Sequence, residues 1–173
     1  MAGRRQLRQA VAAFFAPPAV TGLERVSAAM PKILQGQELQ AAATPGTGAA
    51  CWVTIERDAQ HRIAIGGALS GQKLRVYRVH LQLIFKSLIA STDQAGVDPG
   101  VLAMDAFDDL LDGLEARLLS DRTLGGSVWQ AGEGDRLFGE DVAIQAGTPA
   151  TTPDAIYIEG DVAFLVIEAL VNT

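Results

Sequence analysis

The sequence KLRVYRVHLQLIFKSLI occupies residues 73–89, and from residue 77 onward its apolar side chains recur at every second position. A period of two, rich in β-branched and aromatic residues, is typical of a half-buried β-strand. One face is formed by Tyr77, Val79, Leu81, Leu83 and Phe85, and the other by Arg78, His80, Gln82, Ile84 and Lys86. Such a strand would be roughly 30–40 Å long, beyond the usual length, so it needs partners along its whole extent.

The preceding segment predicts one partner. Residues 50–57 (ACWVTIER) alternate in the same way, and a tight connection at 58–60 leads to residues 62–65, which predicts a β-hairpin. Glycines between residues 66 and 71 then break the chain before the long strand. Residues 32–50 are small and polar and predict a mobile loop.

The end of the chain predicts a second partner. Residues 156–171 are typical of a strand, with a bulge suggested at Gly160-Asp161. Residues 162–167 are apolar on both faces, as expected of a central strand that is covered on both sides. A further short strand is predicted at residues 23–27.

Two helices complete the predicted fold. Residues 3–15 form a short amphipathic pattern that ends before Pro17-Pro18, and residues 104–119 form the clearest helical pattern of the chain. The apolar stripe of the second helix consists of Phe107, Leu110, Leu111, Leu114 and Leu118. We therefore expect a single α+β domain over residues 1–173, with a sheet organised around a long central strand.

The opposite face of the second helix is acidic, with Asp105, Asp108, Asp109, Asp112 and Glu115. Neighbouring carboxylates suggest a divalent metal site, but such a site usually takes ligands from more than one element. A solvated acidic face is the favoured interpretation. Three of these acids would also lie near the helix N-terminus, where the helix dipole stabilises negative charge.

Residues 120–153 are glycine-rich and weakly patterned, apart from a brief strand predicted at 141–145. A segment of this kind is either mobile or an arm that becomes ordered against a partner. It contains Trp129 and Phe138, large apolar residues outside any periodic pattern. Packing into the domain is the favoured interpretation for both, and contact with a partner is the alternative.

The composition limits the class of protein. The hydrophobic content is 49%, and no apolar run approaches the ~20 residues needed to span a bilayer, so we expect no membrane partner. The single cysteine, Cys51, indicates folding in a cytoplasm. The net charge of −6 is unevenly distributed, with +5 over residues 1–103 and −11 over residues 104–173. This asymmetry reflects solubility, contact between basic and acidic surfaces of neighbouring copies, or an acidic lining along which DNA slides without binding.

No catalytic or cofactor motif is found in the sequence. His61 and His80 have no metal-ligand spacing, and Cys51, on the apolar face of a predicted strand, is expected to be an inert buried thiol. Walker, dinucleotide-binding, nucleophile-elbow and zinc-protease patterns are absent from the sequence. We therefore expect no enzyme, no catalytic residues, no metal site and no cofactor.

The order of predicted elements, together with GGALSGQKLRVYRVHLQLIFKS at residues 66–87 and AFDDLLDGLEARL at 106–118, resembles tail terminator proteins of long-tailed bacteriophages and their head–tail completion relatives. The resemblance implies a small α+β structural subunit, with both helices packed against a mostly antiparallel sheet. This subunit would be made in the host bacterial cytoplasm and located in the virion at the head–tail junction. It implies a ring, typically hexameric, on the head-proximal end of the tail tube. That ring would stop tube polymerisation, dock the head connector and let DNA pass through its lumen without specific binding.

Arg75 and Arg78, on or beside the long strand, are candidate subunit-interface residues together with Trp129 and Phe138. Reversing the charge of the two arginines is expected to weaken assembly or docking more than folding. Two rival functions remain open. One is another phage neck protein or a tail tube subunit, and the other is a soluble α+β domain that binds or converts a small molecule.

Overall fold

The computed structural model describes residues 3–31, 47–62, 73–88, 96–132 and 142–170, which form an α+β fold as predicted. Its two helices are α1 (Arg4–Phe14) and α2 (Pro99–Ser120). Its seven strands are β1 (Leu23–Ser27), β2 (Thr47–Arg62), β3 (Lys73–Leu88), β4 (Gln130–Ala131), β5 (Val142–Ala146), β6 (Ala150–Thr151) and β7 (Ala155–Leu170).

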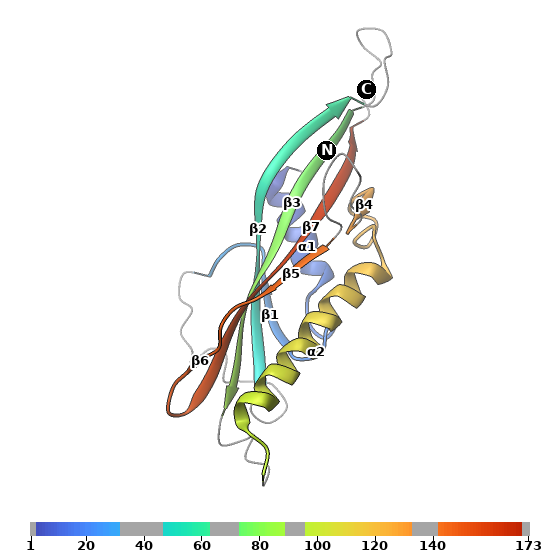
Figure 1. The fold of residues 1–173 in the computed structure, drawn as a ribbon. Coiled ribbons are helices and arrows are strands. Elements are labelled where there is room, and N and C mark those ends of the chain that lie inside the picture. The colour runs from blue at the N-terminus through green and yellow to red at the C-terminus, as the bar shows by residue number, and fades with distance from the viewer. Residues whose placement is uncertain (1–2, 32–46, 63–72, 89–95, 133–141, 171–173) are drawn as a thin grey trace.

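A single sheet organises the molecule, with strand order β1-β2-β3-β7-β4 and with β5 and β6 also paired to β7 (Figure 1). Among the described strands, only β1 and β2 pair in parallel, and the other pairings are antiparallel. The strand predicted at residues 73–89 lies between β2 and β7, so its predicted central position is confirmed.

The prediction of a bulge at Gly160-Asp161 is wrong for the pairing of β7 with β3. These two strands pair without a register shift from Lys73↔Leu170 to Leu88↔Ala155. The irregularity lies instead in β2, where Glu56 is inserted between Ile55 and Arg57. Gly160 has another role. It lies under an aromatic ring of α2, so the glycine reflects helix packing rather than an interrupted ladder.

The predicted hairpin at residues 50–65 is also wrong. β2 continues through the expected turn at 58–60 to Arg62, and Gln60 pairs with Arg75 of β3. Residues 47–50, predicted as loop, form the first part of β2. The long ladder of β3 offers backbone partners at every position, and this pairing outweighs the local turn preference. Residues 32–46 and the glycines between 66 and 71 lie outside the described residues.

Both helices cover the same face of the sheet (Figure 1). α1 packs on β1 and β2, whereas α2 packs on β3 and β7. Aromatic contacts join the layers, with ring centroids 5.6 Å apart for Phe85 and Phe107 and 6.3 Å apart for Phe15 and Phe164. The predicted apolar faces of residues 73–89 and of α2 are both buried in this core. We call the sheet face opposite the helices the outer face.

Helix α2 begins at Pro99, five residues before its predicted start. Asp98 is the N-cap, and its carboxylate accepts a hydrogen bond from the Gly100 N–H at 2.7 Å. Aspartate at the N-cap followed by proline is a favoured helix start, which explains why the helix begins before the apolar periodicity does. Because Asp105 and Asp108 lie beyond the first turn, the predicted stabilisation by the helix dipole does not apply to them.

The segment 120–153 is more ordered than predicted where it is described. It contributes β4, β5 and β6, all paired to β7, and β5 corresponds to the strand predicted at 141–145. These short strands extend the sheet beyond β7.

Candidate functional site

A groove of about 400 Å³ lies on the outer face, above the middle of β3 and β7. The side chains that line it include Met30, Trp52, Ile84, Gln145, Glu159 and Asp161. They come together because the strands alternate. Ile84 of β3 lies opposite Glu159 of β7, and their neighbours two positions along, Gln82 and Asp161, are also opposite each other.

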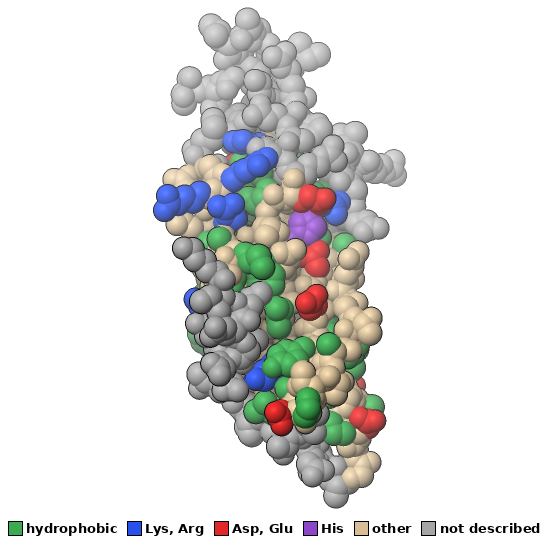
Figure 2. Space-filling view, turned by 90° about the vertical axis from the view of Figure 1, so that its left-hand side faces the viewer, with side chains coloured by type: hydrophobic (Ala, Val, Ile, Leu, Met, Phe, Trp, Pro, Cys, Tyr) green, Lys and Arg blue, Asp and Glu red, His purple; other side chains and the backbone are tan. Residues whose placement is uncertain are grey.

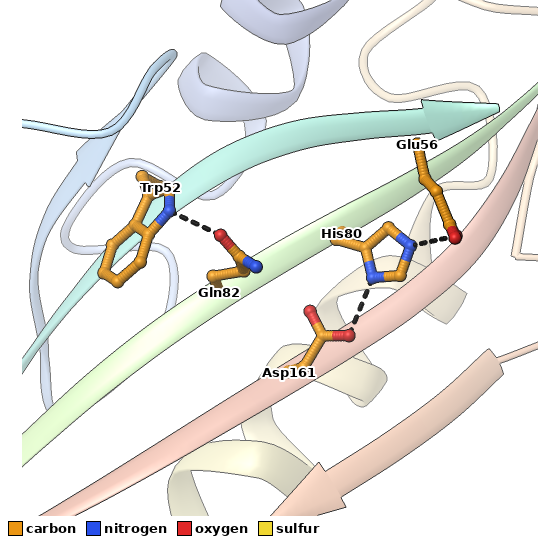
Figure 3. Close-up of polar contacts among 5 residues, drawn as sticks. All are labelled: Trp52, Glu56, His80, Gln82 and Asp161. Carbon is orange, nitrogen blue, oxygen red and sulfur yellow. Dashed lines mark hydrogen bonds and ion pairs between the residues drawn. The ribbon is translucent and has the colours of Figure 1, made fainter. Parts of the chain in front are cut away.

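Trp52 forms one wall of the groove, and its indole N–H donates a hydrogen bond to the side-chain oxygen of Gln82 at 2.7 Å (Figure 3). The two residues are cross-strand partners on β2 and β3. The indole is buried although it lies on the face away from the helices. The hydrogen bond satisfies its polar atom and fixes the ring against the sheet.

Next to the groove, His80 bridges two carboxylates from the neighbouring strands (Figure 3). Its Nδ1 lies 2.7 Å from Asp161 Oδ2 and its Nε2 lies 2.9 Å from Glu56 Oε2. Glu56 is the residue inserted in β2, so the irregularity supplies one of the two carboxylates. Ionised carboxylates only accept hydrogen bonds, so both contacts are complete when each ring nitrogen carries a proton. Figure 2 shows acidic side chains beside a histidine on this face.

This arrangement ties three strands together and offers no nucleophile. Among the described residues, no group of three or more histidine, cysteine, aspartate or glutamate side chains is placed to hold a metal ion. The residues of the acidic face of α2 were the candidates for such a site. They are exposed or half-buried side chains of a single helix.

Cys51 is buried on the helix side of β2. Burial, and to a smaller extent the charge of Asp161, raises the pKa of its thiol to about 12. The thiol is therefore protonated at neutral pH and is unsuited to act as a nucleophile.

The two arginines predicted as interface residues lie on opposite faces of β3. The Arg75 guanidinium lies 5.2 Å from the centre of the Tyr77 ring, on the helix side, and Arg75 is opposite the buried Glu168 of β7. Arg78 is half-buried on the outer face. The structure thus ties Arg75 to intrasubunit contacts and leaves Arg78 as the surface candidate.

Trp129 is 56% exposed, so the favoured interpretation that it packs into the domain is wrong. Its backbone N–H donates to the Ile167 carbonyl oxygen at 3.2 Å, which holds the backbone to β7 and leaves the indole outside. Leu124 and Val128, in the preceding turn, are buried and anchor this segment. Phe138, the other aromatic candidate, lies outside the described residues.

The turn before Trp129 is held by the Asp121 carboxylate. It accepts hydrogen bonds from the Thr123 hydroxyl at 2.6 Å, the Thr123 N–H at 2.9 Å and the Gly125 N–H at 2.9 Å. These hydrogen bonds lower the pKa of Asp121 below its usual value, and the bond from the Thr123 hydroxyl contributes most. Leu124, Gly125 and Gly126 all have positive φ, so the turn has a defined shape.

The exposed surface of the helix layer has opposite charges on its two flanks. α1, on the β1 side, presents the exposed Arg4 and Arg5 and the half-buried Arg8, and α2 presents its exposed aspartates on the β7 side. The asymmetry that the sequence shows between its two parts is thus also an asymmetry in space.

No family model and no curated protein matches this chain. Within the part of the chain that the structure describes, no helix is both long and apolar enough to cross a membrane. The proposed function therefore rests on the sequence resemblance and on the surface features described above.

Sequence reasoning missed both the groove and the histidine bridge. Glu56, His80 and Asp161 are far apart in the sequence, and their contact depends on the register of three strands. The alternation did place His80 and Gln82 on the correct face, and the same alternation places Glu159 and Asp161 on one face of β7. The alternation in β7 was therefore the sequence signal that could have indicated two carboxylates on one face of the sheet.

Proposed function

We propose that this chain is a structural virion protein, the tail terminator of a long-tailed bacteriophage. In this role it forms a ring, typically hexameric, at the head-proximal end of the tail tube. The ring stops tube polymerisation, offers a docking surface to the head connector and lets DNA pass. Its location is the head–tail junction, and its partners are further copies of itself, the tube protein and the connector or head-completion protein.

The observation that carries the proposal is the charge distribution of the helix layer. Arginines of α1 lie on one flank and acidic residues of α2 lie on the other. Two different, complementary surfaces on one subunit favour head-to-tail contact, which closes into a ring when the rotation between copies permits it. A symmetric dimer formed through one flank alone, by contrast, would place like charges together.

Trp129 supports the proposal independently. Exposed tryptophans are unfavourable on a free surface, and tryptophan is enriched among the residues that dominate protein interfaces. Trp129 directly precedes β4, which pairs with β7 at the end of the sheet opposite β1. It is therefore placed to anchor the contact that the charges orient.

Negative-stain imaging of the purified protein over a range of concentrations, at low and moderate salt, tests the proposal. Closed rings with a central pore and no long tubes support it, whereas long tubes indicate a tube subunit. Strict monomers call for the same imaging with tail tubes added, and tubes left uncapped would then refute the terminator function. A ligand that copurifies would favour the small-molecule alternative.

Charge exchange tests the subunit contact itself. Arg5→Glu or Asp108→Arg alone should reduce the ring fraction at low salt, and a mixture of the two variants should restore part of it. Asp154→Asn, outside both helices, is the control and should assemble like the wild type. Equal assembly of all single variants would contradict the proposed contact while leaving ring formation itself open to direct imaging.

A further inference from the structure

We propose that the groove on the outer face binds an extended, arginine-bearing segment of a partner protein. Its volume of about 400 Å³ lies within the ~300–1,000 Å³ range of ligand clefts. The inference concerns the face opposite the charged helix layer. It therefore stands whether or not the chain forms rings.

The floor of the groove carries two carboxylates that are suited to cations. Glu159 and Asp161 are two positions apart on β7, so both project from the outer face, roughly 6–7 Å apart along the strand. The Glu159 side chain is exposed, and among the described residues no ion pair of its carboxylate is found. In a chain with net charge −6, this site favours a positively charged partner.

Asp161 is held in place on one side only. Its Oδ2 contacts His80, whereas its Oδ1 is buried and has no hydrogen-bond partner among the described residues. A buried acceptor without a partner is unfavourable, and a guanidinium that displaces the groups covering Oδ1 and donates to it would relieve that cost. The histidine bridge thus orients a carboxylate that retains hydrogen-bonding capacity.

The wall and floor opposite β5 are apolar. Met30 is 63% exposed at the rim, Trp52 is fixed by Gln82, and Ile84 is half-buried on the floor. The methylene stem of an arginine packs on such a surface, and its guanidinium stacks on aromatic rings while pairing with carboxylates. Arginine therefore matches both halves of the groove better than a compact ammonium group does.

The spacing of the carboxylates specifies the shape of the ligand. Side chains on one face of an extended peptide also recur at every second residue. The two arginines of an Arg-x-Arg sequence therefore have the same spacing as Glu159 and Asp161. The predicted occupant is an extended segment with arginines at alternate positions.

The test uses the full-length ¹⁵N-labelled protein and the peptide Ac-Val-Arg-Leu-Arg-Val-NH2. The matched control peptide has citrulline in place of both arginines, which removes the charge and keeps the shape. The two tryptophan indole N–H signals report on location, because Trp52 lines the groove and Trp129 does not. A Trp129→Phe variant assigns them.

We expect the arginine peptide to shift the Trp52 signal and to leave that of Trp129 in place, with binding at least fivefold tighter than for the citrulline peptide. Glu159→Gln should weaken binding by about two- to fivefold, as for an exposed ion pair. Asp154→Asn, an equal change of charge at an exposed position outside the groove, should leave binding unaltered. Imaging of the same variants shows separately whether rings form.

Several outcomes would overturn the proposal. They are no shift of Trp52 at millimolar peptide, equal shifts of both indoles, or equal affinity for the citrulline peptide. Equal weakening by Glu159→Gln and Asp154→Asn would show attraction to net charge only, and would overturn it as well.

Discussion

Gly160, in the middle of β7, lies directly beneath the ring of Phe107 of α2. A Cβ built on this glycine would lie 2.7 Å from Phe107 Cζ, closer than real side-chain carbons approach. The phenyl ring fills the space that every other residue type would occupy. Contact between helix and sheet at this point therefore depends on the absence of a side chain.

Replacing Gly160 with alanine should destabilise the fold. The added methyl group overpacks a buried site, which typically costs about 1–3 kcal/mol of unfolding free energy. Urea unfolding followed by circular dichroism measures the change. Phe107→Leu should cost stability in the wild type and cost less, or nothing, in the Gly160→Ala background. Additive effects of the two changes would contradict a direct contact.

The two candidate arginines of β3 should differ in their effects on folding. Arg75→Glu removes a cation from the Tyr77 ring and places a carboxylate opposite buried Glu168, whose carboxylate already accepts from the Tyr77 hydroxyl at 3.3 Å. We expect it to lower the unfolding free energy by roughly 3 kcal/mol. Arg78→Glu, on the outer face, should cost less than about 1 kcal/mol.

Thermal melts of the two variants, measured side by side, check this expectation. Arg78→Glu then provides a folded protein in which the effect of this position on assembly can be measured. A larger loss of stability for Arg78→Glu than for Arg75→Glu would contradict the assignment of Arg75 to intrasubunit contacts.

Cys51 should make the fold sensitive to alkaline pH. Its pKa is raised from 9.0 to about 12 in the folded state, so between these values the unfolded chain has lost the thiol proton and the folded chain retains it. Stability from this group is thus complete below about pH 9 and falls by about 1.4 kcal/mol per pH unit above it. Cys51→Ala, compared over pH 8–11, should lack this component, and parallel curves would refute the expectation.

The turn held by Asp121 should loosen in acid. The carboxylate has a lowered pKa in the folded state, so its contribution is present above the unfolded value near 3.8 and is lost as the pH falls through the folded value. Asp121→Ala should speed amide hydrogen exchange at Thr123 and Gly125, because the N–H groups of both residues donate hydrogen bonds to the Asp121 carboxylate. The amide of Leu7 in α1 serves as the control. Unchanged exchange at both turn positions would show that the hydrogen bonds do not hold the turn.

The predictions from periodicity succeeded where burial alone determines structure. The alternation of residues 73–89 assigned every side chain from Tyr77 to Phe85 to its correct face, and the two-sided apolar character of residues 162–167 located a central strand. Both patterns reflect which face excludes water. This information is local, because the apolar pattern within each strand indicates which face of that strand is buried.

The failures arose where distant residues decide. β2 extends through residues 58–60 because β3 supplies partners there, and Gly160 accommodates a ring rather than a bulge. The bridge between Glu56, His80 and Asp161 requires the register of three strands at once. The start of α2 was the exception, since Asp98-Pro99 is a local helix signal that lies outside the apolar periodicity behind the predicted start at residue 104.

The unbroken register of β3 and β7 also has a mechanical consequence. Their pairing runs from Lys73↔Leu170 to Leu88↔Ala155, so the starting ends of the two strands lie at opposite ends of the ladder. Tension that pulls Lys73 and Ala155 apart along the strand axis loads the hydrogen bonds of the ladder together, in shear. Tension applied at Leu88 and Ala155 instead opens the bonds one after another. The subunit is therefore strong along its length and weak to peeling from one end.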